Sequence, residues 1–144
     1  RLAKNFSNIV GIKDATGNLE SVISLINTAP QGLHVISGDD ALALPVVLSG
    51  GSGVISVIGG ALPNQVSQMI RLALEGKVDA ATVYQNQMKS LIELIFEEGN
   101  PSGVKKLSEH LGLCSCSVRL PLIEASSKLS HSILEAHKTL AQSM

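Results

Sequence analysis

Aromatic residues and unbalanced charge are both scarce in this sequence. Its 144 residues include no tryptophan, one tyrosine and two phenylalanines, and the formal net charge is −1. Nucleic-acid surfaces need basic patches and, for single strands, aromatic side chains on which bases stack, so we expect no nucleic-acid partner. No apolar run approaches the roughly 18 residues of a membrane helix, and the start shows no signal-peptide pattern, so we expect no membrane association.

Metal-ligand patterns are also missing from the sequence. The two cysteines, Cys114 and Cys116, are separated by a single serine, and the four histidines show no ligand spacing around them. Structural zinc sites usually have four ligands, so two thiols alone make an incomplete site. We therefore expect no metal, and ordinary reduced thiols in a cytoplasmic protein.

The apolar residues that are present follow an alternating pattern of strands and helices. With 44% hydrophobic and 16% charged residues, the composition suits a buried α/β core. Apolar runs predict strands at residues 8–12, 33–36 and 53–57, and the first reads as a strand buried on both faces. Helical periodicity predicts helices at about 19–29, 40–49, 63–75, 79–98, 102–111 and 127–142. This order is typical of a parallel sheet followed by a helical layer.

Several single residues predict how these helices begin and pack. Asn18, Asp40 and Asp79 each precede a helical pattern and are expected N-caps, and Pro63 suits a first helical position. Tyr84 could be taken for a proton shuttle, but it falls on the apolar stripe of the helix at 79–98, which indicates packing.

Lys13 follows the first apolar run, at the C-terminal end of the expected strand. Ligands of α/β folds bind at this edge of the sheet. An amine held among apolar side chains gives up its proton more readily than one in water, and the neutral amine can attack a carbonyl to form a Schiff base. A solvated lysine at a strand end is the alternative that this strand alone leaves open.

Three strands are too few to complete the fold that this pattern indicates. A barrel of parallel strands takes eight, and an open sheet this narrow leaves apolar edges bare. Either another chain completes the sheet, or most of its strands precede Arg1 in a longer protein. We expect the second arrangement.

Distinctive motifs lie next to the predicted strands and in the loops between the later predicted helices. They are Gly-Ile-Lys-Asp-Ala-Thr-Gly at 11–17, Ser-Gly-Asp-Asp at 37–40, Gly-Gly-Ser-Gly-Val-Ile-Ser-Val at 50–57, Gly-Asn-Pro at 99–101 and Val-Arg-Leu-Pro-Leu at 118–122. With these motifs in register, nearly the whole chain resembles the C-terminal part of the dihydrodipicolinate synthase family. Members of that family are pyruvate-dependent enzymes of the class I aldolase type.

The resemblance implies an α/β fold, a site and a reaction. Residues 1–77 would form the C-terminal part of a (β/α)8 TIM barrel with its last three strands, and residues 78–144 the last barrel helix and a helical C-terminal domain. Lys13 falls on the family's Schiff-base lysine, and Gly38 and Ile55 fall on positions whose backbone faces bound pyruvate. The family condenses pyruvate with aspartate semialdehyde in bacterial lysine biosynthesis, needs no cofactor and usually forms homotetramers.

Two other functions stay open at this point. N-acetylneuraminate lyase and the 2-keto-3-deoxy-sugar-acid aldolases resemble this family and share the lysine, and a non-catalytic fragment or scaffold belongs to another class altogether. In the family, the proton relay, the arginine that holds the semialdehyde and the lysine feedback site all lie upstream of the Schiff-base strand. We therefore expect the 144-residue chain alone to have no appreciable synthase activity.

Overall fold

The computed structural model describes residues 1–143, and the side chains of residues 1–142. The elements run in the order α1 (Leu2–Asn5), β1 (Gly11–Asp14), α2 (Leu19–Thr28), β2 (His34–Ser37), α3 (Ala43–Leu48), β3 (Gly53–Val54), the 3-10 turn η1 (Ile58–Gly60), α4 (Pro63–Leu74), α5 (Val78–Glu97), α6 (Ser102–His110) and α7 (Ser127–Ser143). The predicted alternation of strands and helices, and the helical run that follows it, are confirmed.

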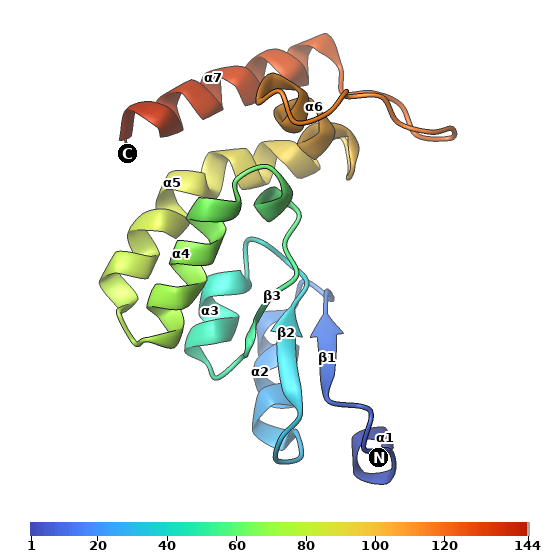
Figure 1. Ribbon diagram of the computed structural model, residues 1–144, viewed down its shortest axis with the longest axis vertical. Coiled ribbons are helices and arrows are strands. Elements are labelled where there is room, and N and C mark those ends of the chain that lie inside the picture. The colour runs from blue at the N-terminus through green and yellow to red at the C-terminus, as the bar shows by residue number, and fades with distance from the viewer. Residues whose placement is uncertain (144) are drawn as a thin grey trace.

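The strands form a parallel sheet in the order β1-β2-β3, at one end of the molecule (Figure 1). Helices α2 and α3 cover one face, where Val35 of β2 is buried with Val22 and Val46 from the two helices. Because side chains alternate between the faces of a strand, the neighbouring Ile36 points to the other face. The described residues therefore cover one face of the sheet with helices and leave the other open.

The first strand differs from our prediction in its position and its burial. It begins at Gly11 rather than at residue 8, and both Gly11 and Ile12 are exposed, Ile12 to 42%. Burial on both faces is therefore wrong for this strand. The reason is that β1 lies at the edge of the sheet, with β2 as its only neighbour among the described strands.

Helices α4 to α7 form a second layer that shares one apolar core. Helix α4 packs on α5, and α5 packs on α6 and α7, as Figure 1 shows at the end of the molecule away from α1. Tyr84 is partly buried against this core, so the prediction that it packs is confirmed. No helix within residues 1–143 is both long and apolar enough to cross a membrane. The division of the chain at residue 77 stays a prediction.

Local signals placed some helix starts correctly and others wrongly. The Asn18 side chain accepts a hydrogen bond from the Ser21 N–H at 3.0 Å, and Pro63 is the first residue of α4, both as predicted. Asp79 is not an N-cap, because α5 begins one residue earlier, at Val78. Lys77 takes the cap position without a side-chain hydrogen bond, and Asp79 lies in the first turn, where its charge complements the helix dipole.

Candidate active site

Lys13 is the third residue of β1 and pairs with Ile36 of β2. Paired residues of parallel strands point to the same side, so Lys13 points to the open face of the sheet. Its side chain is exposed, and the expectation that this amine is buried among apolar side chains is wrong for this chain. The cause is the narrow sheet: within the described residues, no further strand or helix covers the face on which Lys13 lies.

The Lys13 side chain nevertheless lies against the loop that follows β2. A methyl group on Gly38 would lie 2.5 Å from Lys13 Cε and 2.7 Å from Ala15 Cβ, closer than carbon atoms can approach. The Gly38 N–H also donates to the carbonyl oxygen of Asp14 at 2.6 Å, which ties the end of β1 to this loop. Only glycine at residue 38 leaves room for the lysine in this position.

Asp14 closes the turn directly after Lys13. Its Oδ1 accepts hydrogen bonds from the Thr16 N–H at 2.9 Å and from the Thr16 hydroxyl at 2.7 Å. The backbone hydrogen bond, followed by the hydroxyl, lowers the pKa of Asp14 below its ordinary value, because both stabilise the charged carboxylate. This turn fixes the backbone at the C-terminal end of β1.

Ile55 lies directly after β3, which is shorter than predicted. Its N–H donates to the carbonyl oxygen of Ser37 at 2.8 Å, so residue 55 follows the sheet although β3 itself ends at Val54. The predicted strand to residue 57 is wrong because the N–H groups of Val57 and Ile58 bind a side chain instead of a neighbouring strand. Gly38 and Ile55 therefore lie on the loops that follow two adjacent strands.

The side chain that binds the Val57 and Ile58 N–H groups is Asp40, which is only 3% exposed. Its Oδ2 accepts hydrogen bonds from the Val57 and Ile58 N–H groups, each at 3.0 Å, and its Oδ1 accepts one from the Ser56 hydroxyl. The prediction that Asp40 caps the helix after β2 is wrong. Leu42 is the N-cap residue of α3, and Asp39 holds the turn before it, because Asp39 Oδ1 accepts from the Leu42 N–H at 3.0 Å.

The role of Asp40 is the main feature that sequence reasoning missed. The available signal was the adjacent pair Asp39 and Asp40 ahead of a single helix, since one carboxylate is enough to cap it. The second carboxylate needs other donors if it is buried. Its donors lie 16 to 18 residues further along the chain, at a separation that local patterns do not reveal.

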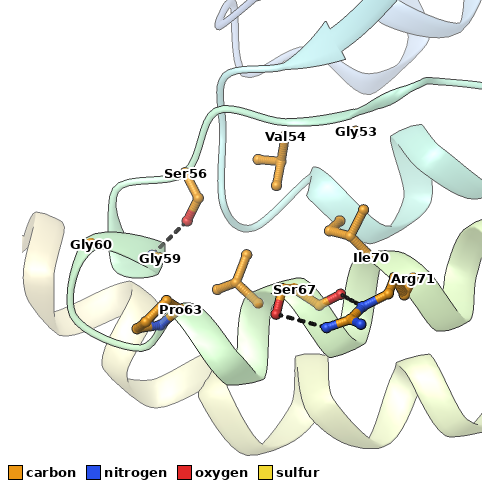
Figure 2. A pocket seen from close by; sticks show the side chains of 10 residues that line it. Gly53, Val54, Ser56, Gly59, Gly60, Pro63, Ser67, Ile70 and Arg71 are labelled. Atoms are coloured by element: carbon orange, nitrogen blue, oxygen red, sulfur yellow. Dashed lines mark hydrogen bonds between the residues drawn. The ribbon is translucent and has the colours of Figure 1, made fainter.

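A cavity of about 670 Å³ lies between β3 and α4 (Figure 2), and Lys13 is not among the residues that line it. Gly53, Val54 and Ser56 line one wall and α4 lines the other, where Arg71 reaches the Ser67 carbonyl and hydroxyl oxygens at 3.5 Å each. Neither Gly38 nor Ile55 lines it. On this side β3 has no partner strand within residues 1–143. The cavity therefore lies where a further strand is missing, and not at the carboxyl ends of the strands, where Lys13 lies.

The two cysteines lie in the segment between α6 and α7 as free thiols. Hydrogen bonding to the Glu109 carboxylate, burial and hydrogen bonding to Glu124 raise the pKa of Cys116 to about 11. Glu109 itself has a pKa lowered to about 2, chiefly by its hydrogen bond to Lys106. No group of three or more His, Cys, Asp or Glu side chains within the described part of the chain could hold a metal ion.

Comparison with known proteins agrees with this fold over nearly the whole chain. Residues 1–141 match the Dihydrodipicolinate synthetase family. The 4-hydroxy-tetrahydrodipicolinate synthase of Flavobacterium psychrophilum is 50% identical over 131 residues, which cover 91% of this chain and 45% of that protein. The synthase of the same name from Porphyromonas gingivalis is 39% identical over 143 residues, 99% of this chain and 48% of that protein.

Solved structures give the same result. Dihydrodipicolinate synthase from Aquifex aeolicus superposes with a TM-score of 0.92 at 35% identity, over 97% of this chain and 48% of that one. The 4-hydroxy-tetrahydrodipicolinate synthase from Methylacidiphilum fumariolicum SolV superposes with a TM-score of 0.93 at 34% identity, over 99% of this chain and 47% of that one. The predicted fold class, part of a TIM barrel followed by helices, is confirmed. The chain spans about half the length of the curated relatives it matches, and it belongs to the dihydrodipicolinate synthetase family.

Proposed function

We propose that this chain carries the Schiff-base part of a 4-hydroxy-tetrahydrodipicolinate synthase, a lyase of amino-acid biosynthesis, with Lys13 as the nucleophile. The observation that carries the proposal is the contact of Lys13 with Gly38 at the carboxyl ends of β1 and β2. An amine at this edge of a barrel sheet, beside a glycine that leaves space, suits attack on a small keto acid.

The chemistry needs few groups at Lys13 itself. Lys13 Nζ attacks the carbonyl carbon of pyruvate, and loss of water leaves an iminium. The iminium draws electrons from the adjacent methyl group, which loses a proton, and the resulting enamine attacks the aldehyde carbon of aspartate semialdehyde. Because the iminium is the electron sink, the reaction calls for no cofactor. In this proposal the backbone at Gly38 and Ile55 faces the bound pyruvate.

The full-length enzyme supplies what this chain does not contain. We assign the remaining barrel strands, the proton relay and the group that holds the semialdehyde to residues upstream of Arg1, and we propose a homotetramer in lysine biosynthesis. Support for the upstream residues comes from the relatives, whose matched part is 45% and 48% of their length. The free thiols of Cys114 and Cys116 are compatible with a cytoplasmic enzyme.

A turnover assay on a completed barrel tests this function. The N-terminal half of the Flavobacterium psychrophilum synthase, joined ahead of Arg1, gives a protein of the relatives' length, called here the joined barrel. We expect it to consume pyruvate and aspartate semialdehyde, and Lys13→Ala to abolish turnover because no other group takes the place of the nucleophile. The 144-residue chain alone is expected to show no appreciable turnover.

The matched control is Lys77→Ala. Lys77 is an exposed lysine that pairs with Glu75 at 2.7 Å between α4 and α5, and its loss is expected to leave turnover unchanged. Turnover that survives Lys13→Ala would contradict the proposal. A joined barrel that cleaves N-acetylneuraminate or 2-keto-3-deoxy acids in preference to condensing aspartate semialdehyde would replace the synthase with one of the related aldolases.

A further inference from the structure

We propose that Asp40 is a positioning residue, whose buried carboxylate holds residues 56–58 so that the backbone of Ile55 keeps its place after β3, next to the end of β2 that leads into Gly38. The inference rests on the proposed function, because it is that function which gives Ile55 a substrate to face. What carries it is the geometry of one side chain that reaches from the loop after β2 to the loop after β3.

The segment after β3 depends on Asp40 for its shape. Beyond Ile55 its backbone leaves the sheet, and the Val57 and Ile58 N–H groups both bind Asp40 Oδ2 at 3.0 Å. The Ser56 hydroxyl donates to Asp40 Oδ1 and accepts from the Gly59 N–H at 2.7 Å, as Figure 2 shows for the second bond. One carboxylate therefore binds the three residues directly after Ile55, and the Ser56 hydroxyl extends this set of hydrogen bonds to Gly59.

Asp40 is itself fixed from the other side by the helical layer. The Gln85 side-chain amide on α5 donates to the carbonyl oxygens of Asp40 and Ala41 at 3.3 and 3.2 Å. The Gly38 N–H, two residues before Asp40, is bound to the Asp14 carbonyl oxygen behind Lys13. A continuous set of hydrogen bonds thus runs from the end of β1 through the loop after β2 to Ile58. A shift of Asp40 would move the backbone at Ile55 relative to Lys13.

The geometry separates two substitutions of Asp40. In Asp40→Asn the amide oxygen can still accept from Val57 and Ile58 while the NH2 group donates to Ser56, so the segment keeps its shape. In Asp40→Ala the half-buried Val57 N–H and the buried Ile58 N–H lose their acceptor and the segment is released. A positioning role therefore predicts a mild effect of asparagine and a strong effect of alanine, whereas a proton-transfer role would make both severe.

Amide hydrogen exchange on the 144-residue chain tests the structural part without any substrate. The Val57 and Ile58 amides are expected to exchange at least about tenfold faster in Asp40→Ala than in the unchanged chain, because they become unbonded. In Asp40→Asn their exchange should stay within about threefold. Unchanged exchange in Asp40→Ala would overturn the proposal.

Pyruvate kinetics in the joined barrel test the consequence for the site. Asp40→Ala is expected to raise the KM for pyruvate by about tenfold or more, and Asp40→Asn by less than about threefold, since a tenfold change corresponds to one lost interaction of moderate strength. Glu98→Ala is the matched control. Its carboxylate binds the Ser126 N–H and hydroxyl at 2.8 and 2.5 Å and ties the end of α5 to the segment before α7, away from Lys13. It should lower the melting temperature and leave this KM unchanged.

The outcomes keep the two proposals apart. If the unchanged joined barrel shows no turnover with pyruvate and aspartate semialdehyde, the proposed function fails, and the exchange experiment alone judges Asp40. If turnover is normal and Asp40→Ala keeps the original KM for pyruvate, only the positioning role is overturned. Should Asp40→Ala not fold, Ser56→Ala decides, because it leaves the Asp40 carboxylate in place and removes only the Ser56 hydroxyl, which binds Asp40 and the Gly59 N–H. A KM raised by about threefold supports the proposal and an unchanged KM overturns it.

Discussion

Gly38 shows how one missing side chain can determine the place of a reactive group. The lysine at residue 13 could lie anywhere on the open face of the sheet, but it lies across Gly38, where a methyl group would be 2.5 Å from Lys13 Cε. The backbone at Gly38 adopts no unusual dihedral angle, because its φ does not lie in the positive range that favours glycine. The need for glycine here comes from close approach alone.

Gly38→Ala should therefore displace both the Lys13 side chain and the backbone at Ala15, whose Cβ would lie 2.7 Å from the added methyl group. We expect the substitution to destabilise the chain by roughly 1–3 kcal/mol, as overpacking does, and to lower turnover of the joined barrel about 100-fold through the misplaced amine. Urea unfolding and the turnover assay measure the two effects. Gly60→Ala is the control, because a methyl group there meets no atom within 4 Å. Equal effects of the two substitutions would contradict the close-approach argument.

Cys116 illustrates how neighbouring carboxylates raise the pKa of a thiol and so keep it protonated. With its pKa raised from 9.0 to about 11, it stays protonated in the folded chain at pH values where an ordinary thiol ionises. The folded state then binds this proton more tightly than the unfolded state. The contribution of the protonated Cys116 thiol to the free energy of unfolding is therefore fully present below pH 9 and is lost as the pH rises through about 11.

Alkylation by iodoacetamide at pH 9 follows this difference directly, since the thiolate is the reactive form. We expect the exposed Cys114 to react at least about tenfold faster than Cys116. Glu109→Gln should speed the reaction of Cys116, because it removes the carboxylate whose hydrogen bond contributes most to the raised pKa. Peptide masses at timed intervals give both rates. Equal rates for the two thiols would count against the raised pKa.

At the scale of the helices and strands, local chemistry could be predicted and distant partners could not. The cap at Asn18 and the helix start at Pro63 depend on residues within one turn, and both were predicted from the sequence. The end of β3 depends on Asp40, which lies more than a dozen residues away, and its prediction was wrong. The exposure of Lys13 depends on the width of the whole sheet, which no short motif encodes.

The crossing of α5 and α6 is a close contact between two helices that a single substitution should disrupt. A methyl group on Gly103 of α6 would overlap the Ile95 carbonyl oxygen and lie 2.6 Å from Ile95 Cα, which is backbone that cannot rotate away. We expect Gly103→Ala to cost about 1–3 kcal/mol or more in the free energy of unfolding, measured by urea denaturation of the chain. A loss no larger than that of Gly60→Ala would mean that the helices separate easily.

At the scale of the whole molecule, residues 1–143 form a sheet that is covered by helices on one face and has no partner strand at either edge. Val10, Ile12 and Ile55 are 61%, 42% and 52% exposed near these edges, although they belong to strands or strand ends. Apolar side chains and unpaired strand edges of this kind favour association with further strands. In the proposed full-length enzyme these are the strands of the other half of the barrel.

The central claim is that the amine of Lys13 forms an imine with pyruvate, and chemical trapping measures it most directly. The joined barrel is incubated with pyruvate, reduced with borohydride, digested and analysed by peptide mass. The account predicts the mass of one reduced pyruvate adduct on the peptide that contains Lys13, and none on the peptide that contains Lys77. A Lys13 peptide that stays unmodified while the enzyme turns over, or an adduct on another lysine, would contradict it.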